Sequence, residues 1–242
     1  MKEKVDMKKF LIFSLAGWLL LGLILLVGCS SIETPHCDHG YTDTKEALVS
    51  CQKTAEQGDA LAQIYLGNKY HHGKGDVTKD YKQALHWYKK AADQGWATAQ
   101  YDLGQMYFRG EGVTQDYKEA FEWFKKAAEQ GDAKVQHVLG AMYDHGKGVI
   151  EDDKQAIHWY RKAAEQSHAP AQSNLGILYA KGEGVMQDFV VAHMWFNIAS
   201  LSGYKKASEM RALFTKHLSP TQRSEAEVLA QEWVAEQRVE KD

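Results

Sequence analysis

Two short motifs in this sequence have the spacing of a serine nucleophile and its lysine partner. Ser50 to Lys53 and Ser202 to Lys205 both fit S-x-x-K, one of three elements that together make a serine-acylating site. The other two elements, S-D-N and K-T-G, occur nowhere in the 242 residues. The acylating set is therefore incomplete, and we predict that the chain has no catalytic residues.

The eleven histidines and three cysteines raise the question of a metal site. His36, Cys37 and His39 lie close together, but their spacing matches no standard zinc pattern and no fourth ligand is evident. The sequence also contains no H-E-x-x-H, P-loop or G-x-G-x-x-G fingerprint. We therefore predict neither a metal site nor a cofactor.

The start of the chain has the pattern of a secretory signal. Lys8 and Lys9 precede an apolar run from Phe10 to Val27, and the sequence L-V-G-C that ends at Cys29 resembles a bacterial lipobox. That resemblance implies that Cys29 is lipidated and becomes the mature N-terminus. An uncleaved membrane helix is the alternative, because the run of 18 residues reaches the lower limit for spanning a bilayer.

The two remaining cysteines are candidates for a disulfide. With Cys29 taken by lipid, Cys37 and Cys51 remain in an oxidising compartment, where an even count favours pairing. This bond would contribute up to ~3 kcal/mol and would attach the polar tether to the first helix. Free or intermolecular thiols, and the metal site considered above, are the alternatives.

The net charge of the mature chain and its predicted location limit the kinds of partner that it can bind. Removing the leader, with its four lysines and two acidic residues, leaves 25 basic and 30 acidic side chains. Such a surface has no basic field, so we expect no nucleic acid partner. By resemblance to enterobacterial sorting, Ser30 directs the lipid-anchored protein to the periplasmic side of the outer membrane, with the inner membrane as the alternative.

A period of 36 residues organises the chain after the tether. It is marked by four evenly spaced tryptophans: Trp87, Trp123, Trp159 and Trp195. Each copy has two helical runs, the first with small residues such as Ala99 and Gly104 and the second with an amphipathic face. Because a lone helix pair cannot bury its apolar face, the copies must stack into a solenoid. We expect the tryptophans in its core rather than in a ligand cage.

Each second helix has its own start and stop signals. An aspartate stands at each predicted N-cap: Asp80, Asp116, Asp152 and Asp188. Gln or Glu follows three residues later in the first three copies, which predicts a capping box. Glycine follows the helix end in three copies and Ser167 in the other, at a position that favours a left-handed conformation. At one loop position the copies alternate in charge, and we expect neighbouring copies to pair these side chains: Lys74, Glu111, Lys147 and Glu183.

The four copies share one sequence pattern, which residues 97–131 fit most closely. It reads A-x-A-Q-x-x-L-G-x-x-Y-x-x-G-x-G-V-x-x-D-Y-x-x-A-x-x-W-[YF]-x-x-A-A-x-Q-G. This pattern resembles the Sel-one-like repeat (SLR) family, relatives of the tetratricopeptide repeats. The resemblance implies an all-α fold, a right-handed α-α superhelix of stacked helix-turn-helix repeats. Asp153 in the third copy and Phe189 in the fourth replace the tyrosine of the motif.

The repeats and their flanks divide the chain into five predicted segments. These are a lipoprotein signal peptide at 1–29, a tether at 30–44, an N-terminal capping half-repeat at 45–59, four Sel-one-like repeats at 60–203 and C-terminal capping helices at 204–242. The sequence Ser219-Pro220-Thr221-Gln222 predicts the start of the closing helix. Ser219 would be the N-cap, Pro220 would stand at N1, and Gln222 at N3 would complete a capping box. Atypical terminal helices are what a finite solenoid needs.

Recognition is expected at positions that vary between copies, because the repeated positions serve stacking. In the first helix of each copy the variable positions fall at i, i+4 and i+7 and form one stripe, which the tetratricopeptide resemblance places on the concave side. The predicted binding residues are Ile64, His71, Tyr101, Gln105, Phe108, His137 and Asp144. Tyr101 and Phe108 are the predicted anchors, because aromatic side chains often carry binding energy. Drift at unconstrained surface positions is the alternative.

We therefore expect a non-catalytic scaffold or adaptor in the bacterial cell envelope, with protein or peptide partners in the concave groove. Some members of the SLR family, the Helicobacter cysteine-rich proteins, have been described as penicillin-binding or β-lactamase-like. They make a cell-wall or β-lactam-directed enzyme the alternative, although the paired cysteines of those relatives are missing from the repeats of this chain. An envelope factor in host infection is a third possibility that the family includes.

Overall fold

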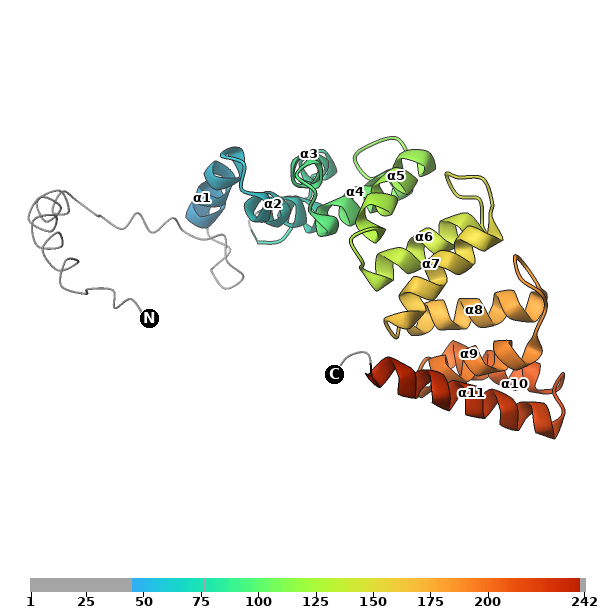
Figure 1. Cartoon of the computed structure of the whole chain (residues 1–242). Helices are drawn as coiled ribbons and strands as arrows, with labels where there is room; N and C mark the ends of the chain where they lie inside the picture. The colour runs from blue at the N-terminus through green and yellow to red at the C-terminus, as the bar shows by residue number, and fades with distance from the viewer. Residues whose placement is uncertain (1–44, 76, 240–242) are drawn as a thin grey trace, which may run out of the picture.

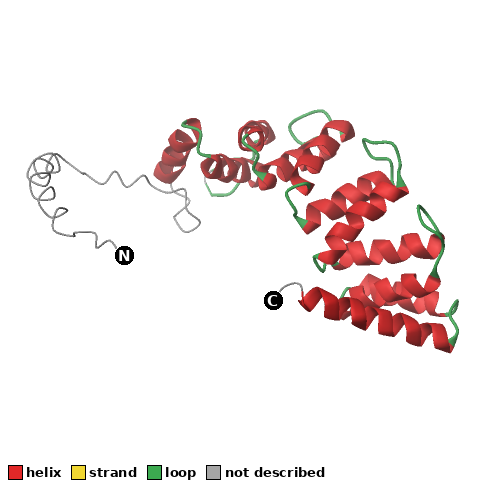
Figure 2. Ribbon diagram, viewed as in Figure 1, coloured by secondary structure: helices red, strands yellow, loops and turns green. Residues whose placement is uncertain are grey.

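The part of the protein that the structure describes is built from helices alone. The computed structural model describes residues 45–75 and 77–239, and within them it has eleven helices and no strand (Figures 1 and 2). The helices are α1 (Lys45–Glu56), α2 (Ala60–His72), α3 (Tyr81–Asp93), α4 (Ala97–Arg109), α5 (Tyr117–Ala128), α6 (Ala133–Asp144), α7 (Asp153–Glu165), α8 (Ala169–Lys181), α9 (Phe189–Leu201), α10 (Lys205–Thr215) and α11 (Pro220–Val239). The predicted signal peptide and tether, with Cys29 and Cys37, lie outside the described residues. Of the helices just named, none is both long enough and apolar enough to cross a bilayer.

Successive helices pack side by side and form a curved stack. Each helix from α1 to α9 packs against the next one along the chain, and α11 returns to pack on α9. Figure 1 shows the row of helices bending through an arc, from α1 at one end past α5 and α6 to α11 at the other. The all-α superhelix predicted from the repeat is confirmed.

The four repeated tryptophans are buried, as predicted. Their exposed fractions lie between 4% and 7%. Trp123 belongs to a cluster with Ala84 and Tyr88 of the preceding repeat, so its ring joins neighbouring copies. The ring of Trp195 meets Trp233 of α11 edge-on, with 5.3 Å between centroids. The tryptophans therefore serve packing between repeats, and the closing helix supplies a partner for the last one.

An aromatic ring from the second helix explains the glycine in the first helix of each repeat. At Gly104 a Cβ atom would lie 2.8 Å from the ring of Phe124, whose side chain is fully buried. The same close approach occurs in the other copies: Gly67 with Tyr88, Gly140 with Tyr160 and Gly176 with Phe196. The absence of a Cβ atom therefore lets an aromatic ring of the second helix pack directly on the backbone of the first.

The predicted aspartate N-caps are present, whereas the capping boxes predicted beside them are wrong. Asp116 is extended at φ −143°, and its Oδ1 accepts from the backbone N–H groups of Lys118 and Glu119. The reciprocal bond is absent because the N–H of Asp116 donates to the carbonyl of Tyr107. Glu119 instead accepts from Trp123 Nε1 at 3.0 Å. The N-cap N–H is occupied in the same way in the other copies: Asp80, Asp152 and Asp188.

Helix ends follow the predicted signals. The glycines after α3, α5 and α9 have φ values of +91°, +102° and +78°. Ser167, after α7, has φ +64° and is the one non-glycine residue with positive φ in the described part of the chain. The capping box predicted for the closing helix is confirmed, since the N–H of Ser219 donates to Gln222 Oε1 at 3.0 Å and the N–H of Gln222 donates to Ser219 Oγ at 3.2 Å.

A ladder of glutamine side chains, which the repeat pattern did not predict, joins each repeat to the next. Gln100 is buried in α4, and its Nε2 donates to the carbonyl of Ala92 at 3.2 Å. Gln130, just after α5, donates to Gln100 Oε1 at 2.8 Å and to the carbonyl of Gly95 at 2.9 Å. Gln166 makes the same two bonds one copy later, to Gln136 Oε1 of its own repeat and to the carbonyl of Gly131 in the repeat before it. Neutral amide groups therefore bridge the stack at regular intervals.

The glutamine ladder stops in the fourth repeat. Gln172 still donates to the carbonyl of Ala164 at 3.1 Å. One period after Gln166 the chain has Ser202, whose side chain is too short to reach it. As a result Gln172 Oε1 is buried and has no hydrogen-bond partner among the described residues.

Both ends of the stack are covered by atypical helices. Met210 and Phe214 of α10 pack against Ala180 and Phe196, and the rings of Phe214 and Phe196 stack 5.6 Å apart. Ala180 is 3% exposed, so the variable stripe is not open along α8.

At the other end Cys51 of α1 is 5% exposed, packs in one cluster with Leu66 and Trp87, and takes part in a disulfide bond. The other two cysteines lie outside the described residues, and the pairing of Cys51 with Cys37 stays a prediction.

Candidate functional site

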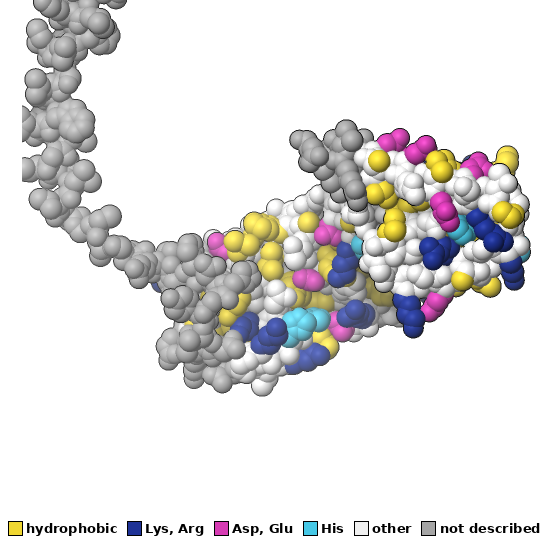
Figure 3. Space-filling view, turned by 90° about the horizontal axis from the view of Figure 1, so that it is seen from below, with side chains coloured by type: hydrophobic (Ala, Val, Ile, Leu, Met, Phe, Trp, Pro, Cys, Tyr) yellow, Lys and Arg dark blue, Asp and Glu magenta, His cyan; other side chains and the backbone are white. Residues whose placement is uncertain are grey.

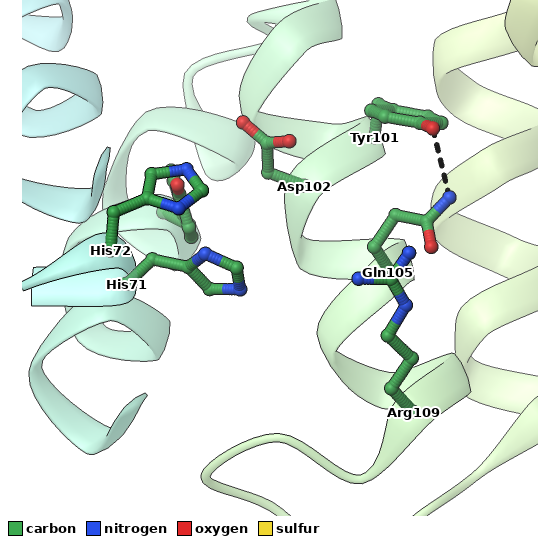
Figure 4. Close-up of a pocket in the computed structure, with 7 residues that line it drawn as sticks. His71, His72, Tyr101, Asp102, Gln105 and Arg109 are labelled. Carbon is green, nitrogen blue, oxygen red and sulfur yellow. Dashed lines mark hydrogen bonds between the residues drawn. The ribbon is translucent and has the colours of Figure 1, made fainter. Parts of the chain in front are cut away.

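A pocket of about 170 Å³ lies between α2 and α4, in the first two repeats. Its lining residues come from α2, α3 and α4: His71, His72, Tyr88, Tyr101, Asp102, Gln105 and Arg109. Figure 4 shows the two histidines of α2 facing the side chains of α4 across an open gap. In Figure 3, histidine side chains lie among basic and acidic ones on the N-terminal part of the surface. Neighbouring copies therefore contribute polar groups to one hollow.

One wall of the pocket is held by a contact between repeats. His71 Nε2 donates to Glu111 Oε2 at 2.9 Å, and the two side chains are 18% and 20% exposed. The hydroxyl of Tyr81 donates to the second oxygen of Glu111 at 3.4 Å. The other ring nitrogen of His71, Nδ1, is buried and has no hydrogen bond within the described residues. The imidazole is thus committed to Glu111, which lies in the loop after α4.

The opposite wall carries an acidic group without a partner. Within residues 45–75 and 77–239, Asp102 makes no hydrogen bond and no ion pair. Burial raises the pKa of its carboxyl to about 6, although the charges of His71 and Lys134 act in the opposite direction. A buried carboxylate without hydrogen bonds costs stability, and such groups concentrate at functional sites. Asp102 is therefore the chemically distinctive residue of the pocket.

The aromatic residues of the pocket already have polar partners. The hydroxyl of Tyr101 accepts from Gln105 Nε2 at 2.9 Å, the bond drawn in Figure 4. The hydroxyl of Tyr88 donates to Asn68 Oδ1 at 2.9 Å, and burial raises its pKa. Lys134 Nζ lies 4.9 Å from the centre of the Tyr101 ring. These contacts hold the two rings as apolar walls beside the free carboxylate.

Two basic side chains complete the lining. Burial lowers the pKa of His72, with a further lowering by the charges of His71 and Lys74, so its neutral form is favoured at neutral pH. Arg109 is exposed and forms no ion pair in the described part of the chain. The pocket therefore presents a half-buried carboxylate within and a guanidinium at its edge.

The structure brings three of the seven predicted binding residues together, since His71, Tyr101 and Gln105 all line the pocket. Phe108, the other predicted anchor, is half-buried and does not line the pocket. Its ring contacts that of Tyr117 at 4.9 Å between centroids. Ile64 is likewise half-buried and packs against the core cluster of the first repeat. Of the two aromatic anchors, only Tyr101 reaches the pocket.

The other two predicted residues lie one repeat further on, around Tyr160. Asp144 Oδ2 accepts from the hydroxyl of Tyr160 at 3.0 Å. His137 Nε2 lies 3.3 Å from Asn174 Nδ2, and its ring is 5.0 Å from that of His168. Burial, with the charge of His168, lowers the pKa of His137 to about 4. Both predicted residues are thus engaged in contacts within the stack and do not meet the pocket.

The stripe left out four residues of the pocket: His72, Tyr88, Asp102 and Arg109. Asp102 could have been recognised from the sequence, by comparing the four copies at its position. At its position the other copies have Tyr65, Val138 and Asn174, so only the second repeat places a charge there. The position lies one residue after Tyr101 and therefore just outside the stripe of i, i+4 and i+7.

The alternating loop charges do not pair with one another in the described residues, and that prediction is wrong. Glu111 contacts α2 as described, and Lys147 Nζ lies 5.1 Å from the ring centre of Tyr117. Glu183 pairs with Lys181, the last residue of α8 in the same repeat, at 3.0 Å. The reason is that each loop lies over the start of the second helix of the preceding repeat, so it does not reach the preceding loop.

The serine–lysine motifs lie at ordinary positions of the stack. Ser202 is the exposed C-cap of α9, and Lys205 begins α10 with its Nζ 4.0 Å from Glu209. Ser50 lies within α1, where its carbonyl accepts from Thr54 Oγ1 at 3.1 Å. Among the described residues, no group of three or more His, Cys, Asp or Glu side chains is placed to hold a metal ion.

A model of a known repeat family matches the chain four times, and each match coincides with one helix pair. The Sel1 repeat model matches residues 60–96, 97–132, 133–168 and 169–204. The chain belongs to the Sel1 repeat family. Each match covers one first helix, one second helix and the turn to the next copy, so this Sel1 repeat protein places its pocket between its first two family repeats.

Two solved structures resemble this Sel1 repeat protein along most of its length. A protective antigen of uropathogenic Escherichia coli strains, which displays an SLR fold, is 43% identical, with a TM-score of 0.70 over 78% of this chain and 41% of that one. A Sel1 repeat protein from Oxalobacter formigenes is 38% identical, with a TM-score of 0.61 over 68% of this chain and 48% of that one. The chain thus spans less than half the length of either relative. No curated protein sequence matches it.

Proposed function

We propose that this chain is a non-catalytic adaptor of the bacterial cell envelope, which binds a segment of a partner protein along its first helices. The observation that carries the proposal is the pocket between α2 and α4. Its Asp102 and Arg109 are not used by the stack, whereas the tryptophans and ladder glutamines are buried or hydrogen-bonded in it. Sel1 repeat proteins are generally protein-interaction scaffolds, which agrees with such a role.

The envelope part of the proposal rests on the leader. The basic residues, the apolar run and the L-V-G-C sequence before Ser30 favour export and lipidation at Cys29, with anchoring on the periplasmic side of the outer membrane. The test is metabolic labelling with a radioactive fatty acid in a Gram-negative host. Labelled protein that becomes unlabelled in Cys29→Ala supports the proposal, and an unlabelled native chain contradicts the anchor.

Binding along the first helices is tested by photo-crosslinking in cells. A photoreactive amino acid at position 105 lies in the pocket, and the same amino acid at position 122 lies on the exposed side of α5 as the matched control. We expect position 105 to give a discrete crosslinked species that position 122 does not give, and Tyr101→Ala to reduce it. Equal crosslinking from both positions, or none from position 105, would contradict the proposal.

A second candidate role is supported by one relative. The 43% identical chain from uropathogenic Escherichia coli is a protective antigen, so a role of the present chain in host infection is a related proposal. The crosslinking experiment separates the two roles when it is repeated with host cells present. A partner of bacterial origin supports the adaptor role, and a partner found only with host cells supports the infection role.

A further inference from the structure

We infer that the pocket between α2 and α4 receives the side chain of a lysine or arginine, carried by the partner segment that lies on the first helices. This inference rests on the proposed function and specifies the chemistry of the partner. Asp102 is the group that would meet the cation, and the rings of Tyr88 and Tyr101 would flank its carbon stem.

The carboxylate of Asp102 in the pocket lacks a hydrogen-bond donor. Asp102 accepts nothing from the described residues, although its carboxylate has acceptor sites on both oxygens. Two donors of the lining are committed elsewhere, because His71 Nε2 donates to Glu111 and Gln105 Nε2 donates to Tyr101. An ammonium has three N–H donors and a guanidinium has five, so either group satisfies the carboxylate fully.

The volume of the pocket favours one side chain over a whole small molecule. Pockets for small-molecule ligands usually measure about 300–1,000 Å³, and this one measures about 170 Å³. Its walls are largely aromatic, with Tyr88 fully buried and Tyr101 half-buried. Long basic side chains pack their methylene stems against such walls and keep the charge at the end. A lysine or arginine side chain thus matches both the size and the lining.

The cations already near the pocket do not neutralise Asp102. Arg109 lines the same pocket but forms no ion pair with Asp102 in the described residues. The charge of Lys134 of α6 acts on Asp102, but its ammonium lies over the ring of Tyr101 and forms no ion pair with the carboxylate in the described residues. His72 favours its neutral form, as its lowered pKa indicates. The negative charge of Asp102 is therefore left for a group that comes from outside.

The inference is tested with two peptides that differ only in charge. Both are acetylated and amidated nonapeptides of alanine and serine, one with lysine and the other with norleucine at the centre. Each peptide is titrated into the full chain at pH 7.5, and binding is followed by changes in the ¹H–¹⁵N NMR shifts of the protein. The variants are Asp102→Asn and, as a control with the same change in net charge, Asp93→Asn, whose carboxylate is 55% exposed and lies 3.9 Å from Lys89.

We expect the lysine peptide to bind at least fivefold more tightly than the norleucine peptide, with shifts confined to α2 and α4. Asp102→Asn should remove this preference, and Asp93→Asn should leave it unchanged. Lowering the pH to 5 should also weaken binding of the lysine peptide, because protonation removes the charge of Asp102. Protonation of His72 would act in the same direction, so the Asp102→Asn protein is measured alongside, and it should lack the part of the pH change that Asp102 contributes.

Three results would overturn the inference. They are equal binding of the two peptides, a lysine preference that survives in Asp102→Asn, and lysine-dependent shifts that map to other helices. The proposed function fails separately, through the crosslinking experiment at positions 105 and 122. If a partner crosslinks at position 105 while the lysine preference is absent, the adaptor role stands and the basic side chain is excluded.

Discussion

Restoring the missing rung of the glutamine ladder should stabilise the C-terminal half of the stack. The change is Ser202→Gln, at an exposed position after α9. In the preceding repeats the equivalent glutamine donates to the buried glutamine of its own repeat at 2.8 Å and to a backbone carbonyl of the repeat before it at 2.8–2.9 Å. A glutamine at 202 has the same two acceptors available, Gln172 Oε1 and the carbonyl of Ser167. The first of these is now buried without a partner.

The expected gain follows from three contributions. A net hydrogen bond contributes about 0.5–1.5 kcal/mol, and a buried acceptor without one costs about 1–3 kcal/mol. Ordering a glutamine side chain costs up to about 2 kcal/mol. The balance is a gain of about 1 kcal/mol in the free energy of unfolding, or roughly 2–4 °C in Tm for a chain of this size.

The measurement is thermal unfolding together with amide hydrogen exchange, since stability in a repeat stack is local. Exchange should slow in α8 and α9 and stay unchanged in α2 to α4. Ser202→Glu is the matched control, because glutamate has the same length but offers oxygen acceptors in place of the N–H donors, and should give no gain. Gln166→Ser is the mirror experiment and should destabilise the α6–α7 region by about 1–2 kcal/mol. Equal behaviour of Ser202→Gln and Ser202→Glu would refute the hydrogen-bond explanation.

Three further changes test other parts of the structure. Gly104→Ala should destabilise by about 1–3 kcal/mol despite its better helix propensity, because the new Cβ meets the buried ring of Phe124; a stability equal to the native chain in urea unfolding would contradict this packing. Ser167→Gly should stabilise by about 0.5 kcal/mol, because the left-handed φ of +64° favours glycine, and calorimetry should show the opposite for Gly131→Ser. Asp102→Asn should stabilise the fold by about 2 kcal/mol at pH 7.5 and little at pH 4. The raised pKa of about 6 means that ionisation is more costly in the folded chain, so the penalty is absent below the unfolded pKa and complete above pH 6. A gain that is independent of pH would show that charge is not its cause.

The features that the sequence predicted are those decided by local pattern and period. The tryptophans, the aspartate N-caps and the left-handed helix ends recur at fixed spacing, and each depends on neighbours within one repeat or the next. The capping box failed because the backbone N–H of Asp116 already donates to Tyr107, a bond between two helices that no local motif encodes.

The pocket was only partly predictable because it depends on how far apart the first helices stand. Variation between copies indicated His71, Tyr101 and Gln105, which line the pocket, and their role in binding stays a prediction. It also indicated Phe108, because a ring packed on Tyr117 and a ring open to solvent look alike in sequence. Asp102 was recognisable only as a charge that the other copies lack, and its missing hydrogen bonds became apparent from the packing around it.

The amide ladder also bears on how such chains change in length over evolution. Gln130 bonds only to its own copy, at Gln100, and to the copy before it, at Gly95, and Gln166 makes the same pair of bonds one copy later. Unequal recombination that inserts or deletes one 36-residue unit in the middle of the array therefore recreates the same junction on both sides. Such a rearrangement changes the distance between the first and last helices of the stack. The two copies that contain His71 and Asp102 keep their sequence and their pocket.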